Sequence, residues 1–200
     1  MQELVAKEHV GSLYYHRVDV RDGKKLNSIV VQVASSEGRM DGLVAAAGVQ
    51  QITRAIDYTP EDITKMLEIN YTGVFMAAQA VGKQMIASGR GGTMVLVASM
   101  SGFIANKGLD SPVHNSSKAA VIQLGRNLTM EWGPKGIRVN SLCPGHVITP
   151  IVQEKFEEVP GLRRTWESEN MLGRLAGPEE FAGAIIFMLS DSSSFMTEVV

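Results

Sequence analysis

The sequence is poor in cysteine, which limits both its redox chemistry and its capacity to bind metal. Cys143 is the single cysteine, so the chain cannot form an internal disulfide. The histidines are also few and form no tight Cys/His cluster with the spacing of a zinc site; they are His9, His16, His114 and His146. We therefore predict no metal site and a reducing, intracellular compartment, with the cytoplasm as the expected location.

The sequence also lacks an excess of one charge and a long apolar run. It has 19 Lys and Arg residues against 21 Asp and Glu residues, a formal net charge of -2. This balance gives no global field for binding a phosphate backbone, so nucleic acid is not an expected partner. No apolar run approaches the roughly eighteen residues of a membrane span, and the first residues lack the apolar core of a signal peptide. We predict a soluble protein without membrane contact.

No internal repeat, low-complexity tract or long linker divides the chain. Its 200 residues are 44% hydrophobic, which is enough for an ample core. We therefore predict one domain over residues 1–200. The stretch 146–177 is the least regular, with prolines, glycines and Trp166 in a mixed charged setting. It is equally compatible with an excursion that covers a substrate pocket and with a surface insertion.

Short apolar runs alternate with longer amphipathic stretches, a pattern typical of βα units. Strands are predicted over residues 13–18, 43–47, 93–98 and 137–142. Helices are predicted over residues 23–37, 59–88 with a break near Asn70, 111–132 and 178–190. Thr59 stands directly before Pro60 and two acidic residues, the chemistry of a helix N-terminus. The pattern predicts an α/β fold with four parallel strands at its core.

The segment 112–145 carries the most informative chemical pattern. His114 and Lys118 stand four residues apart in a predicted helix, so their side chains share one face. An imidazole and an ammonium that point into one cleft can act as an acid/base pair. For an isolated pair at this spacing, a solvated helix face is the commoner explanation. The surrounding motifs change that balance.

These motifs resemble those of the short-chain dehydrogenase/reductase (SDR) family. The family's YxxxK signature stands here as HxxxK, from His114 to Lys118, and its RVNxxxPG follows at residues 138–145. DGLVAAAG at residues 41–48 resembles the NNAG strand end, and MLGRLAGPEEFAGAIIFMLSD at residues 171–191 resembles the closing RxGxPEE helix. The resemblance spans nearly the whole chain. It implies a Rossmann-like, doubly wound parallel sheet.

The resemblance also implies a set of catalytic residues, which are Asn70, Ser99, His114 and Lys118. In the family, a tyrosine exchanges a proton with the substrate oxygen, the lysine lowers its pKa and holds the ribose, the serine orients the carbonyl, and the asparagine holds a water. His114 takes the place of the tyrosine. Imidazole has a reference pKa of about 6.5 against about 10 for tyrosine, and a nearby ammonium favours the neutral base. The alternative, which stays open, is that the active site has lost its activity and His114 merely fills space.

NAD(P) is the cofactor that the resemblance implies. The expected cofactor-binding positions are Asp19, Ala46, Gly48, Lys118, Pro144, Gly145 and Thr149. Asp19 matches an acidic residue that contacts the adenine, whereas Lys118 and Thr149 match residues at the nicotinamide half. The sequence does not decide between NAD and NADP.

The family's opening strand and TGxxxGxG turn have no counterpart among the 20 glycines. That turn presents N–H groups and a helix N-terminus to the pyrophosphate, so its absence weakens the expectation that this chain binds the cofactor. The chain also stops where the family's last strand begins. We expect an SDR domain clipped at both ends that lacks the first βαβ segment, a fragment rather than a shortened protein. Made alone, it is predicted to be poorly soluble, oligomeric or partly molten.

Three functions stay open. The first is an NAD(P)-dependent oxidoreductase that interconverts an alcohol and a carbonyl on a small organic substrate. The second is a non-redox isomerase, dehydratase or cyclase in which His114 and Ser99 transfer protons. The third is a catalytically inactive pseudoenzyme. The resemblance further implies a homo-oligomer, either a dimer or a tetramer, formed through the two long helices, 59–88 and 111–132.

Overall fold

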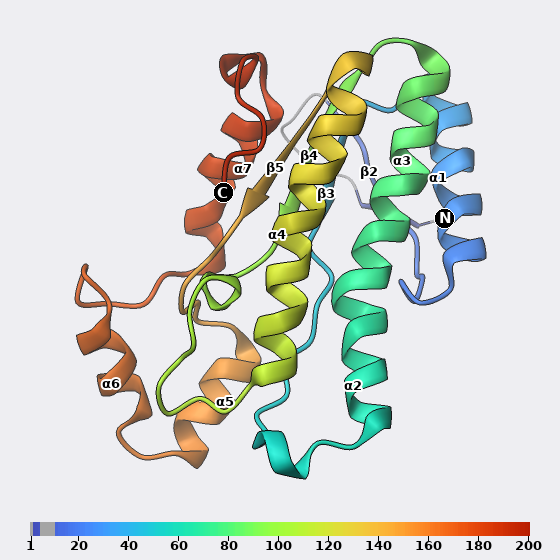
Figure 1. Cartoon of the computed structure of the whole chain (residues 1–200). Helices are drawn as coiled ribbons and strands as arrows, with labels where there is room; N and C mark the ends of the chain where they lie inside the picture. Colours follow the sequence, from blue (N-terminus) through green and yellow to red (C-terminus); the bar gives the residue numbers. More distant parts are fainter. Residues whose placement is uncertain (1, 5–10) are drawn as a thin grey trace.

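A three-stranded parallel sheet forms the centre of the computed structural model, which describes residues 2–4 and 11–200 (Figure 1). Its strands follow the spatial order β3, β4 and β5, with bounds Gly42–Ala45, Gly92–Val97 and Ile137–Leu142. Gly42 is in register with Thr93, and Gly92 with Ile137. Because the strands are parallel, the segments that follow them gather at one edge of the sheet, where α/β folds place their ligand sites.

Helices cover both faces of this sheet (Figure 1). On one face lie α1 (Gly23–Glu37), α3 (Val74–Ser88) and α4 (Pro112–Trp132), with α1 packed against α3. On the other face, α7 (Ala182–Leu189) contacts β4. The alternation of strands and helices predicted an α/β fold, and the helices on both faces make it the doubly wound arrangement that the family resemblance implied.

The hydrophobic core lies between the sheet and the helices α3 and α4. Met94, Leu96 and Val139 on the strands are fully buried, as is Val121 on α4. At the far end of α4, the Trp132 ring packs so closely over α3 that a Cβ on Gly82 would lie 3.0 Å from it. These contacts fix the distance of α4 from the sheet, and α4 carries His114 and Lys118.

The break predicted near Asn70 is present as a π-helical turn. α2 (Pro60–Leu67) is capped by Thr59, whose Oγ1 accepts a hydrogen bond from the Asp62 N–H at 3.1 Å. The π turn Glu68–Gly73 then joins α2 to α3 and completely buries Asn70. Such widened turns are common at functional sites because they redirect a side chain without ending the helix.

The strand predicted over residues 13–18 is not part of the parallel sheet, so the expectation of four parallel strands was wrong. Only β2 (Leu13–Tyr15) is extended, and it pairs antiparallel with β1 (Gln2–Leu4) in a separate two-stranded sheet. All three β2 side chains are exposed. Aliphatic and aromatic content favours an extended backbone, but it does not determine which strand supplies the hydrogen-bond partners.

The stretch 146–177 forms an excursion with two short helices, α5 (Pro150–Glu158) and α6 (Leu162–Glu169). Its two ends meet in a parallel bridge between Val147 and Ala176, and the Ile148 N–H donates to the Ala176 carbonyl at 2.8 Å. The excursion therefore begins and ends at the same place, beside the segment that follows β5. Short 3₁₀ turns complete the described structure at Ala55–Asp57, Met100–Gly102, Gly133–Lys135, Pro178–Phe181 and Asp191–Ser193.

Within the described residues, none of the helices has both the length and the apolar character needed to cross a bilayer.

Candidate functional site

The turns that follow β4 and β5 are tied together at the carboxyl edge of the sheet. Ser99 follows β4 and caps the turn Met100–Gly102, with its Oγ accepting a hydrogen bond from the Ser101 N–H at 3.1 Å. The Met100 N–H donates to the Pro144 carbonyl at 3.0 Å. This bond holds the serine turn beside the segment Pro144–Gly145, two of the predicted cofactor positions.

Asn70 joins the π turn to the segment that follows β3. Its Oδ1 accepts from the Val49 N–H at 2.8 Å, and its Nδ2 donates to the Val49 carbonyl at 2.9 Å and to Ser117 Oγ at 3.0 Å. Both ends of the carboxamide are therefore bonded, which fixes the orientation of the amide. The predicted role of Asn70 in holding a water stays a prediction.

His114 lies in the first turn of α4 and is 9% exposed. Its Nδ1 lies 3.2 Å from the Val49 carbonyl oxygen. Burial lowers the pKa of His114 below the ordinary 6.5, and the Lys118 charge lowers it further against the opposing effect of the Val49 bond. A neutral imidazole is therefore the resting form at neutral pH, and it can accept a proton.

Lys118 lies one helical turn after His114, but its ammonium is directed to another part of the site. Its Nζ donates to the Val97 carbonyl at 2.9 Å, at the end of β4, and the side chain is buried. Desolvation lowers the pKa of Lys118 from 10.5 to about 8, although neighbouring Cys143 acts in the opposite direction. The sequence spacing predicted that the His114 and Lys118 side chains face one cleft. In the structure, His114 lines a small cavity and Lys118 does not.

Ser99 and His114 line a small cavity of about 220 Å³, which we call the inner pocket. Gly145 and Thr149 also line it. Thr149 stands directly before α5, and its Oγ1 accepts a hydrogen bond from the Val152 N–H at 3.3 Å. The structure thus brings residues 99, 114, 145 and 149, which are far apart in the sequence, to one cavity.

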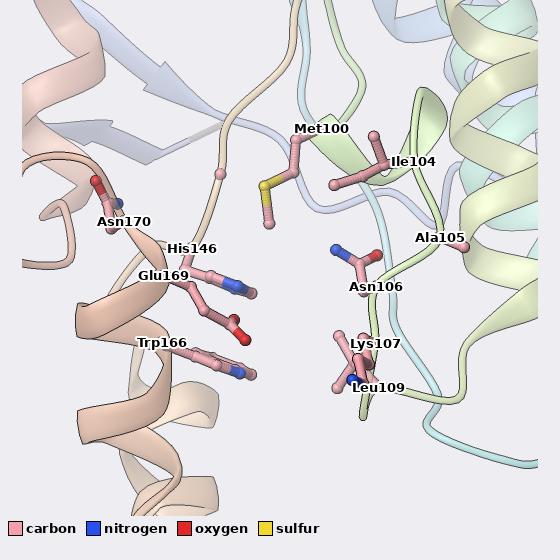
Figure 2. A pocket seen from close by; sticks show the side chains of 11 residues that line it. Met100, Ile104, Ala105, Asn106, Lys107, Leu109, His146, Trp166, Glu169 and Asn170 are labelled. Carbon is pink, nitrogen blue, oxygen red and sulfur yellow. The ribbon is translucent and has the colours of Figure 1, made fainter.

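A larger cavity of about 430 Å³, the outer pocket, adjoins the inner one. The residues shared by the two cavities are Met100, Leu109, Gly145, His146 and Trp166. Figure 2 shows its two walls: His146, Trp166 and Glu169 on one side, and the segment that carries Ile104 and Asn106 on the other. The excursion 146–177 therefore supplies one wall of a pocket, and its role in covering a substrate stays a prediction.

His146 is a pocket residue that the motif analysis did not single out. Its ring stacks on Trp166 with centroids 4.1 Å apart and an interplanar angle of 8°, and Phe156 makes an edge-on contact with Trp166 at a centroid distance of 5.4 Å. Burial lowers the pKa of His146, which Glu169 partly offsets. The sequence signal was its place directly after Pro144–Gly145, but stacking between residues 146 and 166 depends on the path of the excursion.

The described residues fit the nicotinamide half of NAD(P). An ammonium has three donors, and one hydrogen bond of Lys118 goes to Val97. A Cβ on Gly48 would lie 3.3 Å from Lys118 Nζ and 3.5 Å from Asn70 Oδ1, so the glycine keeps the approach to both groups open. Ala46, also exposed, stands at the same strand end.

Asp19 lies apart from both pockets, among the exposed residues. Arg21 donates to its carboxylate at 2.6 Å, and this bond lowers the pKa of Asp19 to about 2. An ionised carboxylate is compatible with the predicted adenine contact, which stays a prediction. In the part of the chain that the structure describes, no three or more His, Cys, Asp or Glu side chains are grouped to hold a metal ion.

The chain is similar to known proteins along almost its full length. The family model described as enoyl-(acyl carrier protein) reductase matches residues 1–199. A short-chain dehydrogenase/reductase of Aspergillus versicolor is 41% identical over 197 residues, covering 96% of this chain and 67% of the relative. The NADH-dependent L-xylulose reductase of Ambrosiozyma monospora is 34% identical over 198 residues, covering 98% and 72%.

Solved structures agree with this similarity. The gluconate 5-dehydrogenase of Burkholderia cenocepacia, solved with NADP and tartrate, superposes with a TM-score of 0.85 at 26% identity, over 91% of this chain and 70% of that one. The sequence motifs, the doubly wound sheet and these similarities agree. The chain belongs to the short-chain dehydrogenase/reductase family.

Proposed function

We propose that this protein is an oxidoreductase that interconverts a polyol and the corresponding ketose with NAD(P). The observation that carries the proposal is the inner pocket, where a serine hydroxyl and a neutral imidazole line one small cavity. Relatives named for L-xylulose and gluconate support a polyhydroxylated substrate.

Ser99 would orient the reacting oxygen. Because its Oγ accepts the Ser101 N–H, and no acceptor for its own proton is present among the described residues, the hydroxyl proton is free to point at a substrate oxygen. The short turn after β4 holds this hydroxyl in place, and fixed donors of this kind stabilise charge that develops on the oxygen.

His114 would exchange the proton. In the oxidative direction, its neutral ring takes the hydroxyl proton as the substrate becomes a carbonyl, and in reduction the imidazolium returns it. Because burial lowers the pKa of His114 below 6.5, the neutral form that accepts the alcohol proton is present at neutral pH. Bound NAD(P)⁺ would supply the acceptor for the hydrogen and electron pair that leave the carbinol carbon.

Lys118 would hold the nicotinamide ribose, with Thr149 at the carboxamide. The N–H groups of Lys118 that have no acceptor among the described residues would be donors for ribose hydroxyls, and Gly48 keeps their approach open. Among the described residues, no glycine-rich turn offers N–H groups to the pyrophosphate. We therefore assign only the nicotinamide half to this set of residues.

The outer pocket would take the part of the substrate beyond the reacting carbon. His146, Asn106 and Glu169 place hydrogen-bonding groups on both of its walls (Figure 2). The ring nitrogens of His146 have no partner among the described residues, so they are free to bind a substrate hydroxyl. A pentitol or hexitol can therefore extend from the inner pocket into the outer one.

The test is turnover of xylitol, galactitol and gluconate with NAD⁺ and NADP⁺, followed by nicotinamide absorbance. We expect turnover with at least one pair, and a loss of at least about a hundredfold in His114→Ala. Direct titration of NADH and NADPH by calorimetry accompanies it as a second readout. Turnover of a substrate without cofactor would favour the non-redox alternative. If the protein shows no turnover and binds no cofactor, the result would favour the pseudoenzyme.

We also propose a small-molecule substrate as the main partner, and a homo-oligomer formed through α3 and α4. Met130 on α4 is 74% exposed and Ile86 on α3 is 40% exposed, so both helices offer apolar side chains to a second copy. Light scattering of the purified chain tests this. A monomer at micromolar concentration would contradict it.

A further inference from the structure

Three residues, Val49, Asn70 and Ser117, form a closed ring of hydrogen bonds with His114. His114 Nδ1 meets the Val49 carbonyl at 3.2 Å, and Asn70 Nδ2 donates to the same carbonyl at 2.9 Å. Asn70 Nδ2 also donates to Ser117 Oγ at 3.0 Å, and Ser117 Oγ donates to the His114 carbonyl at 2.7 Å. The ring therefore begins and ends at His114, and its side-chain members are all buried.

The donors and acceptors in this ring have only one consistent assignment. The Val49 carbonyl accepts but cannot donate, so His114 Nδ1 must carry the proton that joins them. A neutral imidazole has a single N–H, which leaves Nε2 with its lone pair. The Asn70 amide cannot flip, because its Oδ1 already accepts the Val49 N–H at 2.8 Å. His114 Nε2 has no hydrogen-bond partner among the described residues.

We propose that Val49, Asn70 and Ser117 act together to hold His114 in the tautomer with Nδ1 protonated, so that Nε2 is the atom that exchanges the proton with the substrate. Asn70 and Ser117 are thus positioning residues that act through the backbone of Val49 and through the start of α4. The catalytic part of this inference rests on the proposed function. The tautomer itself is a property of the protein alone.

The ring explains how an imidazole can work at a position where the family has a tyrosine. A free histidine exchanges between two tautomers, and only one of them presents a lone pair at a given place. A tyrosine has one oxygen and needs no such selection. A histidine at this position therefore needs an acceptor at a fixed place to select one tautomer. The Val49 carbonyl is that acceptor, and two hydrogen bonds between Asn70 and the Val49 backbone hold it in position.

The direct test is the ¹⁵N spectrum of the histidine side chains in the full chain, recorded at a pH where His114 is neutral. Long-range ¹H–¹⁵N correlations distinguish the two tautomers, and a His114→Gln variant identifies the His114 signals. We expect a single neutral tautomer with Nδ1 protonated. A protonated Nε2 in the neutral ring, or a mixture of both tautomers, would overturn the proposal. Neither substrate nor cofactor is needed, so a failure here is separate from a failure of the proposed function.

Two variants test the positioning residues. In Ser117→Ala, Asn70 loses one acceptor, and we expect kcat to fall about threefold to tenfold with KM unchanged and the second tautomer to become detectable. In Asn70→Ala, both bonds to Val49 are lost, and we expect a mixed tautomer and a larger fall in kcat. Ser116→Ala is the matched control, because Ser116 is exposed on the same helix. Equal effects of Ser116→Ala and Ser117→Ala, or a single unchanged tautomer in a folded Asn70→Ala protein, would refute the positioning role.

Discussion

Replacing the buried Lys118 by methionine should stabilise the protein at neutral pH while it removes a residue that the proposed reaction requires. The pKa of Lys118 lies near 8 instead of 10.5, because burial penalises the ammonium. A difference of this size corresponds to about 3 kcal/mol of unfavourable free energy for the charged form in the folded state. Methionine is similar in length and carries no charge. It also leaves the Val97 carbonyl without its donor, which costs about 1 kcal/mol.

The balance predicts that Lys118→Met raises the free energy of unfolding by about 2 kcal/mol at pH 7. The sign reverses at high pH. Below pH 8, both folded and unfolded chains carry the charged lysine, and the full penalty applies to the wild type. Between pH 8 and 10.5, the folded state loses its proton first, so the unfolded state binds more protons and wild-type stability rises with pH. Above that range, the penalty is gone and only the lost hydrogen bond separates the two proteins.

Urea denaturation followed by circular dichroism at pH 7 and near pH 10.5 measures both differences. Lys83→Met on the exposed side of α3 is the matched control, and it should show no crossover. A Lys118→Met protein that is less stable than the wild type at pH 7, by a margin that does not change with pH, would refute this reasoning. Such a result would mean that the ammonium is well solvated in the folded protein.

Three further predictions concern glycines and a helix cap. Gly48→Ala places a Cβ 3.3 Å from Lys118 Nζ. It should weaken cofactor binding about tenfold in calorimetry and change the free energy of unfolding by less than about 1 kcal/mol. Unchanged binding would contradict the proposal that the cofactor reaches Lys118 past Gly48. Gly91→Ala should cost about 2 kcal/mol more than Gly89→Ala in thermal unfolding. Gly91 and Gly89 both have positive φ, 72° and 66°, but only at Gly91 would a Cβ collide with the Gly136 backbone. Equal losses of stability in the two variants would show that the collision is relieved. Thr59→Ala should cost about 1 kcal/mol through its lost bond to the Asp62 N–H, and a neutral effect in urea titration would show that the cap is dispensable.

The sequence predicted the central elements well where burial dominates. The strand predicted over 137–142 coincides with β5, and 93–98 differs from β4 by one residue at each end. Both strands are largely buried, and the β-branched and aliphatic residues in each of them favoured an extended backbone. The motifs likewise predicted Ser99 and His114, which line one cavity. The roles of these residues stay predictions.

Other features depend on contacts between distant segments, which a residue pattern does not encode. β2 was predicted as a strand, but its antiparallel partner β1 was not. The Val49 carbonyl has no sequence signature, because every residue has a carbonyl group, and its importance depends on the placement of Asn70 and His114 around it. The stack of His146 on Trp166 arises only because the excursion folds α6 back onto the segment after β5.

The most direct test of the account is the pH dependence of kcat/KM for alcohol oxidation, measured in the wild type and in His114→Tyr. Because burial holds the pKa of His114 below 6.5, the wild type should lose activity only below that pH, where the imidazole is protonated. His114→Tyr should move this acidic limb upward by several pH units, since tyrosine has a reference pKa of about 10. The same limb in both proteins, together with full activity in His114→Ala, would contradict the central claim that His114 exchanges the proton.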